Sequence, residues 1–519
     1  MYGHYSTRMG FDPPEELNLA DYFLEARLRE GKGERVALLC GDRRLTYREV
    51  HALANRFGHV LRRMGVGPEQ RVIIALPDGP EYVGALFGIL KVGAVAVMVN
   101  PRLRAEEIAP FYAFTRAPLA IVHAETLEAF AAAARDARYL RRLLVVGGRA
   151  AGHAEFEEES AHAPEALETA PTHRDDPAIW LFSGGTTGRP KAAVQTHLSF
   201  VNTTELYAKR TIGYREDDVT LSVPKLYFGY ATGSNLFFPF SVGARAVLFP
   251  EHPTAEVLFR MIRAHRPTIL VNVPTMVNQM VSHPGAAGQD LSSLRLSTSA
   301  GEALPPELYR RWKETFGVEL LDGLGTAEMW HIFITNRPGD VRPGTLGRVV
   351  EGFEVRVCDE EGSEVPPREV GALWVRGRSR ALGYWQEQER TAASFRGEWV
   401  VTGDLVSRDP EGYITYAGRA DELLKVGGRW VAPQEVESCL LQHPAVKECA
   451  VVGALDPAGL TKPRAFVVAR EARTGLEEEL KAFVRERLPP YTYPREVVLV
   501  DALPRTHLGK VDRSKLRRG

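Results

Sequence analysis

A chain of 519 residues is longer than one hydrophobic core usually serves, so we expect more than one folded unit. Apolar residues make up 44% and charged residues 25% of the chain, a balance typical of globular proteins that excludes disordered and fibrous classes. The formal net charge of −1 excludes an overall electrostatic attraction to nucleic acid or anionic membranes, so bound phosphates must be held by local chemistry.

Cysteine usage and the apolar segments bear on location. The four cysteines are Cys40, Cys358, Cys439 and Cys449, and none shows a Cys-x-x-Cys spacing. So few cysteines in so long a chain indicate a reducing compartment, which we take to be the cytoplasm. The start, Met1 to His4, shows no basic and then apolar run, so we expect no signal peptide. The longest apolar stretch, 84–99, contains Lys91 and is shorter than the ~20 residues of a membrane span. We therefore expect no integral membrane segment, and the sequence leaves homodimer formation open.

The first part of the chain reads as alternating strands and helices. Residues 72–76 form a short apolar run, 82–91 have helical spacing, and 94–99 are again typical of a strand, which predicts a parallel βαβ unit. Residues 150–176 are acidic, carry two prolines and show little periodicity, so we interpret them as a surface connection.

The same alternation continues and then changes character near residue 420. Strand, helix and strand are predicted at 269–273, 276–281 and 294–297. The last hundred residues predict a small α+β unit with helices and strands at 434–441, 446–452, 465–468, 477–488 and 496–499. The predicted fold is therefore α/β, with a large N-terminal domain of several subdomains built on parallel or mixed sheets, and a small α+β C-terminal domain.

A loop rich in glycine and hydroxyl groups follows the apolar run 178–182. Glycines let backbone amides approach phosphate oxygens, hydroxyls donate hydrogen bonds and a lysine adds a point charge. The candidate phosphate-binding residues are Ser183, Gly184, Gly185, Thr186, Thr187, Gly188 and Lys191. A Walker A loop is excluded because Arg189-Pro190 separates Gly188 from Lys191 and Ala192 follows it. An ordinary Gly/Thr turn is the alternative.

This loop resembles the signature of the adenylate-forming superfamily, which includes acyl-CoA and aryl-CoA ligases. Residues 322–328 resemble the second nucleotide motif of that family, which implies ATP contacts at Asp322, Gly323, Gly325 and Thr326, and a magnesium ligand at Glu328. The family usually has Thr directly before this Glu, whereas Thr326 and Ala327 stand here in the opposite order. A dinucleotide fingerprint is disfavoured because Glu328 replaces its third glycine.

Three further segments resemble the family in the same order along the chain. Residues 299–305 resemble the adenine segment and imply contacts at Ala300, Gly301 and Glu302. Thr402-Gly403-Asp404 resembles the ribose motif, with Arg419 as the partner of Asp404. Residues 504–510 resemble the loop that carries the adenylation lysine, which would be Lys510. Taken one by one, these segments are also consistent with ordinary turns and a solvated lysine.

The resemblance implies a division into 1–418, which binds nucleotide and acid, and 419–519, a mobile domain that carries Lys510. The hinge position would be Asp421. The second half-reaction would use a segment that lines the path of coenzyme A: Lys425, Gly427, Gly428, Arg429 and Trp430. With AMP as the leaving group, a thiol attacks the acyl carbon without an enzyme nucleophile, so we name no catalytic cysteine or serine. The catalytic residues that the resemblance implies are Lys510, Lys191, Thr186 and Glu328.

Residues 225–230 and 328–333 resemble the benzoate-CoA ligase branch more than the acetate or long-chain branches. The implied acid slot consists of Gly229, Tyr230, Gly325, Trp330 and His331. Each aromatic residue there is as consistent with core packing as with substrate contact. The sequence therefore predicts an aryl or acyl adenylate and then a CoA thioester made from ATP, Mg²⁺ and coenzyme A, with benzoate or a substituted benzoate as the acid.

Three alternatives remain at this stage. The acid could be a short or medium-chain fatty acid, or the chain could be an adenylation domain that loads a carrier protein, although no carrier segment follows Lys510. The Thr326-Ala327 order also leaves open a nucleotide-binding protein without turnover.

Overall fold

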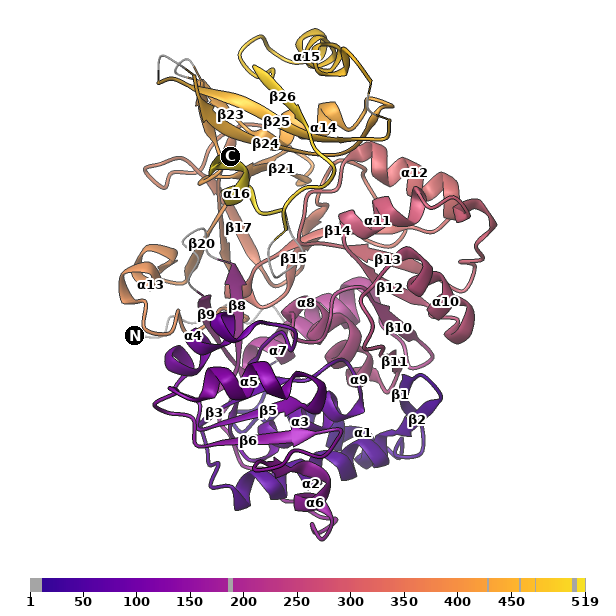
Figure 1. Ribbon diagram of the computed structural model, residues 1–519, viewed down its shortest axis with the longest axis vertical. Coiled ribbons are helices and arrows are strands. Elements are labelled where there is room, and N and C mark those ends of the chain that lie inside the picture. The colour runs from indigo at the N-terminus through magenta and orange to yellow at the C-terminus, as the bar shows by residue number, and fades with distance from the viewer. Residues whose placement is uncertain are drawn as a thin grey trace.

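The structure is a computed structural model that describes residues 12–184, 190–426, 429–456, 459–471, 473–505 and 511–518. Three sheets and their helices form the larger N-terminal part, and a smaller unit drawn in yellow lies at the far end of the molecule (Figure 1). This arrangement agrees with the predicted α/β class.

A seven-stranded sheet has the order β7-β6-β5-β3-β4-β8-β9, in which only β8 and β9 pair antiparallel. Its strands are β3 (Arg71–Ala75), β4 (Val95–Met98), β5 (Leu119–His123), β6 (Arg142–Val146), β7 (Ala154–Glu155), β8 (Pro177–Gly184) and β9 (Pro190–Thr196). The predicted βαβ unit is confirmed, with β3 and β4 parallel and joined by α3 (Pro80–Lys91).

Helix α3 is buried along its whole length and packs tightly on α2 (Tyr47–Arg63). A methyl group added at Gly88 would lie 2.6 Å from Cβ of Phe57, so only glycine permits this close approach of the two helices. The capping box of Thr46 and Glu49 fixes the start of α2. The apolar stretch 84–99 is thus core, as the sequence predicted.

The segment 150–176 is a connection only in part, and here the prediction was wrong. It contains β7, which extends the sheet beside β6, and α6 (Phe156–Ser160), whose Phe156 stacks on Phe57 with ring centroids 3.7 Å apart. One buried aromatic residue in an acidic run anchors this short helix. A single residue leaves no periodicity for a sequence analysis to detect.

A nine-stranded sheet has the order β16-β15-β14-β13-β12-β10-β11-β1-β2. Its strands are β1 (Val36–Cys40), β2 (Arg43–Thr46), β10 (Val219–Ser222), β11 (Arg245–Val247), β12 (Ile269–Asn272), β13 (Leu296–Ser299), β14 (Leu320–Gly325), β15 (Ile332–Thr335) and β16 (Arg348–Val349). Its outer face is covered by α10 (Ala255–His265), α11 (Pro274–Val281) and α12 (Pro306–Phe316) (Figure 1).

Buried aromatic and aliphatic side chains fill the space between these two sheets in one continuous core. The other helices of this part include η1 (Asp21–Glu25), α1 (Ala26–Arg29), α4 (Ala105–Thr115), η2 (Ala124–Thr126), α5 (Leu127–Ala134), α7 (His197–Thr203), η3 (Thr204–Ile212), α8 (Gly229–Thr232), η4 (Gly233–Phe237), α9 (Phe238–Val242) and η5 (Ala286–Gly288). Because α8 and η4 form one short continuous helix inside this core, they hold Gly229 and Tyr230 at a fixed place.

A third sheet has the order β17-β18-β20-β19, with β21 paired to β20. Its elements are β17 (Glu354–Cys358), β18 (Val370–Arg376), α13 (Gln388–Ser394), β19 (Phe395–Arg396), β20 (Trp399–Arg408) and β21 (Ile414–Arg419). Strand β21 ends at Arg419, one residue past the boundary predicted at 418. The domain division itself stays a prediction.

The C-terminal unit follows a two-stranded ribbon of β22 (Leu424–Val426) and β23 (Arg429–Val431). It consists of α14 (Pro433–Leu440), β24 (Val446–Leu455), β25 (Thr461–Ala469), α15 (Leu476–Arg487), β26 (Glu496–Leu499) and α16 (Arg513–Arg518), and its sheet order is β24-β25-β26. The predicted α+β unit is confirmed, with β26 at the bounds that the sequence indicated.

Candidate active site

The candidate phosphate loop joins β8 to β9. The backbone pairs of Ser183 with Lys191 and of Gly184 with Pro190 close the ladder at the base of this loop. The predicted contacts Gly185, Thr186, Thr187 and Gly188 lie outside the described residues, and so does the side chain of Ser183. The described part of the hairpin places Lys191 at the start of β9.

Lys191, Glu328 and Tyr384 form a compact polar triangle. The Lys191 ammonium lies 3.0 Å from Glu328 Oε1 and donates to the Tyr384 hydroxyl oxygen at 2.8 Å. The Tyr384 hydroxyl in turn donates to Glu328 Oε1 at 2.5 Å. The same ammonium lies 4.2 Å from the centroid of the Tyr384 ring, within cation–π range. One cation, one anion and one hydroxyl therefore meet beside the predicted phosphate loop.

Hydrogen bonds from two other segments to the backbone of its turn fix Glu328 in this position. It lies in the short helix η6 (Ala327–Met329) that follows β14. Gln195 Nε2 donates to the Ala327 carbonyl at 2.6 Å, and the amide of Ala381 donates to the Glu328 carbonyl at 2.8 Å. Burial alone would raise the pKa of Glu328, but the Lys191 charge and the Tyr384 hydrogen bond outweigh it and lower that pKa. The carboxylate is therefore ionised where phosphates are expected.

Tyr384 is the residue of this triangle that the sequence analysis missed. It follows Gly383 in a loop that pairs with β9 through a bridge between Ala193 and Tyr384. The only local signal is an aromatic residue next to glycine, which is also typical of a core turn. Its role becomes visible only once the third sheet packs against β9.

The predicted adenine segment follows β13. Ala300 is buried, and Gly301 has a φ of +88°, which favours glycine. The Glu302 carboxylate accepts hydrogen bonds from the Thr275 amide at 3.0 Å and from the Thr275 hydroxyl at 2.8 Å. The Glu302 side chain therefore connects this turn to the first turn of α11, and its carboxylate is already hydrogen-bonded within the protein in this structure.

Asp322 and Gly323 lie on β14, beside the end of β13, where Ser299 pairs with Asp322. Burial raises the pKa of Asp322 well above its usual range. A methyl group at Gly323 would lie 2.8 Å from the carbonyl oxygen of Ile334, so β15 approaches too closely for any side chain there. The structure thus brings the two predicted nucleotide segments together on the neighbouring strands β13 and β14 of the nine-stranded sheet.

Asp404 and Arg419 meet as the ribose motif predicts. They pair across β20 and β21, and the Arg419 guanidinium lies 3.4 Å from Asp404 Oδ1. Burial raises the pKa of Asp404, although the Arg419 charge opposes the shift. Arg419 also lies 3.3 Å from Asp421, the predicted hinge residue, which is exposed. A buried acceptor with an adjacent cation suits a diol near a phosphate.

Aromatic rings pack around His331, one of the residues predicted to form the acid slot. His331 is 2% exposed, and four rings surround it with centroids 4.7 to 5.4 Å away: Tyr207, Tyr230, Phe238 and Trp330. The Tyr230 hydroxyl contacts the Thr298 hydroxyl at 2.7 Å. A methyl group at Gly325 would lie 2.4 Å from the His331 carbonyl oxygen, which makes glycine obligatory at this position. Gly229 lies against Leu181 and Trp330.

Buried side-chain atoms without a hydrogen-bond partner gather along these segments. Within the described residues they include three atoms of the site: Thr326 Oγ1, Trp330 Nε1 and His331 Nδ1. Folded proteins satisfy nearly all buried polar groups, so such a cluster is typical of a surface that a ligand completes. The Thr326 hydroxyl is thus available despite the unusual Thr326-Ala327 order.

The predicted CoA segment spans the β22–β23 ribbon. Gly427 and Gly428 lie outside the described residues, as do the side chains of Lys425 and Trp430. The Arg429 guanidinium lies 4.9 Å from the centroid of the Tyr491 ring. Lys510, predicted as the adenylation lysine, also lies outside the described residues.

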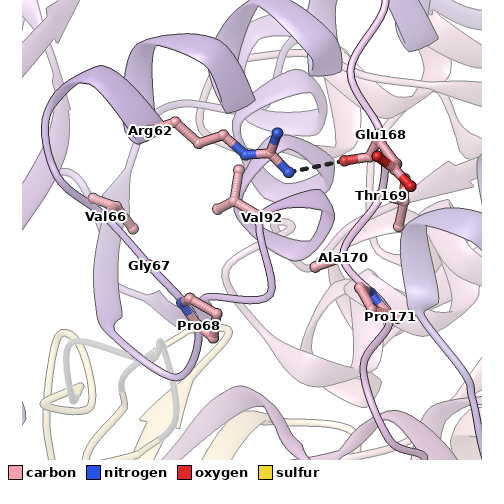
Figure 2. Close-up of a pocket in the computed structure, with 9 residues that line it drawn as sticks. All are labelled: Arg62, Val66, Gly67, Pro68, Val92, Glu168, Thr169, Ala170 and Pro171. Atoms are coloured by element: carbon pink, nitrogen blue, oxygen red, sulfur yellow. Dashed lines mark hydrogen bonds between the residues drawn. The ribbon is translucent and has the colours of Figure 1, made fainter.

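A surface pocket of about 390 Å³ lies away from all these segments (Figure 2). Arg62 of α2 reaches across it and donates to the Glu168 carbonyl at 2.9 Å. The other lining residues are Val66, Gly67, Pro68, Val92, Thr169, Ala170 and Pro171. None belongs to a predicted motif, so we assign this pocket no part in the chemistry.

Three further observations concern metals, thiols and membranes. Among the described residues, no cluster of three or more His, Cys, Asp or Glu side chains could hold a metal ion. All four cysteines are unpaired. In the described part of the chain, no helix has the length and apolarity that crossing a membrane requires.

Comparisons with known proteins agree with the site. Residues 24–385 match the model of the AMP-binding enzyme family, and residues 435–510 match the AMP-binding enzyme C-terminal domain. A benzoate–CoA ligase of Thauera aromatica is 41% identical over 99% of this chain and 98% of its own. The structure of the anthranilate CoA ligase AuaEII with anthranoyl-AMP has a TM-score of 0.94 at 40% identity over 98% of both chains. A benzoate CoA ligase from Burkholderia xenovorans LB400 has a TM-score of 0.89 at 41% identity over 96% of this chain and 99% of its own. The chain therefore belongs to the AMP-binding enzymes, the adenylate-forming superfamily that its motifs predicted.

Proposed function

We propose that this chain is an ATP-dependent acid:CoA ligase that activates a benzoate through an aryl-adenylate. The observation that carries the proposal is the placement of Glu328 and His331 on one short turn. An acid whose ring lies among the aromatic residues around His331 directs its carboxylate toward Lys191 and Glu328. The similarity to benzoate and anthranilate CoA ligases supports the same acid class.

In the first half-reaction a carboxylate oxygen of the acid attacks the α-phosphorus of ATP. The bond from that phosphorus to the bridging oxygen of pyrophosphate breaks, and pyrophosphate leaves with the electron pair. Lys191 places a positive charge beside the phosphates, while Asp404 and Arg419 suit the ribose. The resemblance gives Lys510 the role of stabilising charge at the α-phosphate.

In the second half-reaction the thiol of coenzyme A loses its proton and its sulfur attacks the acyl carbon. The bond from that carbon to the adenylate oxygen breaks, so AMP leaves carrying an oxygen of the original carboxylate. The β22–β23 ribbon is the proposed path of the pantetheine arm. No enzyme nucleophile is required, because AMP is already a good leaving group on the acyl carbon.

Glu328 is the residue that would hold Mg²⁺. Magnesium sites for nucleotides usually combine one or two carboxylates with phosphate oxygens and water, and an ionised, buried carboxylate beside the phosphate loop fits that donor set. When bound, the ion supplies charge neutralisation at the phosphate oxygens. We also propose a cytoplasmic location, which the unpaired cysteines support.

Oxygen-18 labelling tests the adenylate route directly. Benzoate labelled in its carboxylate should transfer one labelled oxygen to AMP when ATP and coenzyme A are present. Label-free AMP would mean that no acyl-adenylate forms. A labelled acyl-AMP that accumulates with coenzyme A present would instead indicate an adenylation domain that serves another acceptor.

A further inference from the structure

The turn that leads into α8 is tied to the start of α3. It follows β10 of the nine-stranded sheet and runs to Gly229, a residue of the predicted acid slot. Leu226 in this turn is fully buried, and both of its backbone groups are engaged. Its amide donates to Asp78 Oδ1 at 2.9 Å, and its carbonyl accepts from the Tyr82 hydroxyl at 3.1 Å. Because α3 joins two strands of the seven-stranded sheet, these bonds connect the two sheets directly before the slot.

Further hydrogen bonds close the same turn and join it to α8. The Phe228 amide donates to the Lys225 carbonyl at 2.9 Å, and the Thr232 hydroxyl of α8 donates to the Leu226 carbonyl at 2.6 Å. The start of α8 at Gly229 therefore continues a turn whose position is set at Leu226. A displacement of Leu226 is passed through the backbone to the predicted slot.

Asp78 holds the Leu226 amide with a buried carboxylate. It is 5% exposed, and burial raises its pKa to about 6, although the Lys225 charge and the Leu226 amide oppose the shift. The Lys225 ammonium donates to the Phe249 carbonyl at 2.6 Å and lies 3.3 Å from the centroid of the Phe249 ring. Burial lowers the pKa of Lys225 to about 8, so the lysine is still mostly protonated at the pH where Asp78 titrates.

Other charged and titratable groups surround this pair, and they include Tyr82, Tyr227, Cys40, Arg102 and Glu251. Burial raises the pKa of both tyrosines and of the Cys40 thiol, so these three groups stay neutral below pH 7. In the predicted slot, burial lowers the pKa of His331 to about 3, so its ring stays neutral above pH 5. Asp78 is therefore the buried group at this turn whose charge changes between pH 7 and pH 5.

We infer that Asp78 is a positioning residue for the aromatic acid, an inference that rests on the proposed function. The ionised carboxylate attracts Lys225 and accepts strongly from the Leu226 amide, so it fixes the turn in the form that presents Gly229 to the acid. When Asp78 takes a proton from solvent, the attraction to Lys225 is lost and the carboxyl becomes a weaker acceptor. The turn is then held less firmly, and the acid binds less tightly.

Acid-dependent pyrophosphate release by the native enzyme and by Asp78→Asn tests this role. A group with a pKa near 6 passes from about one-tenth to about nine-tenths protonated between pH 7 and pH 5, so the KM of the native enzyme for benzoate should rise by about three- to tenfold. Asp78→Asn keeps an oxygen acceptor but cannot ionise, so its KM for benzoate should already be raised at pH 7 and change little by pH 5. Its KM for ATP should match that of the native enzyme at each pH, since both proteins meet the same titrations of ATP and acid.

Asp218 provides a matched control at the other end of β10. It is 2% exposed, accepts from the Arg215 amide at 2.8 Å and pairs with Arg295 at 2.9 Å. Asp218→Asn therefore also removes a buried negative charge next to the same strand, and it should lower the free energy of unfolding. Its KM for benzoate and the pH dependence of that KM should stay those of the native enzyme. A merely structural carboxylate at position 78 would behave in the same way as Asp218.

Lys225→Gln tests the titrating group without a change at Asp78. Because the Lys225 charge holds the pKa of Asp78 down, the rise in the KM for benzoate should begin at a higher pH in this variant. The same pH dependence in the native enzyme and in Asp78→Asn, or a Lys225→Gln profile that does not move, would overturn the inference and leave the ligase assignment intact. A native chain that releases no pyrophosphate with any aromatic acid would overturn the proposed function, and the inference with it.

Discussion

Replacing Tyr384 with phenylalanine should impair the use of ATP more than the use of the acid. The substitution keeps the ring that the Lys191 ammonium approaches at 4.2 Å and that packs edge-on against Phe395 with centroids 5.3 Å apart. It removes only the hydroxyl that contacts Lys191 at 2.8 Å and Glu328 at 2.5 Å. The perturbation is therefore confined to the hydrogen bonds of this hydroxyl, and the two to Lys191 and Glu328 are charge-assisted.

The magnitude follows from what remains after the change. A hydrogen bond to a charged group contributes roughly 1.5–3 kcal/mol, and the direct contact of Lys191 with Glu328 at 3.0 Å survives. Because this contact keeps the two charges paired, we expect the net loss to equal about one such bond, or about 2 kcal/mol. That loss corresponds to roughly a thirtyfold fall in kcat/KM for ATP. The KM for the acid should change by less than about threefold, since the hydroxyl has no contact with the residues around His331.

Steady-state pyrophosphate release, with ATP and acid varied in turn, measures both parameters. Tyr413→Phe is the control, because its hydroxyl also bonds a carboxylate, that of Asp340 at 2.7 Å, away from the site. This control should match the native enzyme. Equal losses for ATP and acid, or no loss in Tyr384→Phe, would refute the argument that this hydroxyl positions the Lys191–Glu328 pair.

Three other changes should have measurable effects. Because the folded-state pKa of His331 is lowered from 6.5 to about 3, the unfolded chain binds the extra proton between these values, and this contribution to stability is lost as pH falls through that range. The free energy of unfolding, measured with urea, should decrease between pH 7 and pH 5 in the native protein by about 2 kcal/mol more than in His331→Phe. Equal decreases in the two proteins would contradict a buried, neutral His331. Gly325→Ala should lower the free energy of unfolding by about 1–3 kcal/mol and suppress aryl-adenylate formation, since its methyl group would lie 2.4 Å from a backbone oxygen. Gly412→Ala is the control, because Gly412 has a φ of +87° but no neighbour within contact distance, and it should leave activity unchanged. Lys510→Ala should slow adenylation by at least about a hundredfold, or ~3 kcal/mol, yet still convert supplied acyl-AMP to thioester; equal loss in both steps would contradict separate roles for the two half-reactions.

Much of the fold follows from local pattern. The strands 72–76 and 496–499 and the helix 82–91 are continuous apolar or periodic runs, and the structure confirms them within one or two residues. The elements at 154–160 were missed because a single buried Phe156 anchors them, and one residue has no period. Periodicity reports buried faces, so it predicts elements that contribute a whole face to the core.

The site was predictable where residues adjacent in sequence act together, and less so where distant segments meet. The pair of Asp404 and Arg419 was predicted from the resemblance to the family, and the pairing of the consecutive strands β20 and β21 brings the two side chains together. Tyr384 was missed because its partners, Lys191 and Glu328, are contributed by other segments and meet it only through the packing of three sheets. The positive φ of Trp330, +61°, is likewise invisible in sequence, since tryptophan does not favour a positive φ.

In the proposed reaction an aromatic carboxylate is joined to coenzyme A at the expense of ATP. The most direct test is CoA-dependent AMP release across benzoate, hydroxybenzoates, phenylacetate, cinnamate and short to medium-chain fatty acids, with the thioester identified by mass spectrometry. We expect an optimum among the benzoates, with one AMP and one pyrophosphate formed for each aryl-CoA. A preference for an aliphatic acid would contradict the aromatic slot around His331, and AMP release that does not depend on coenzyme A would contradict the ligase itself.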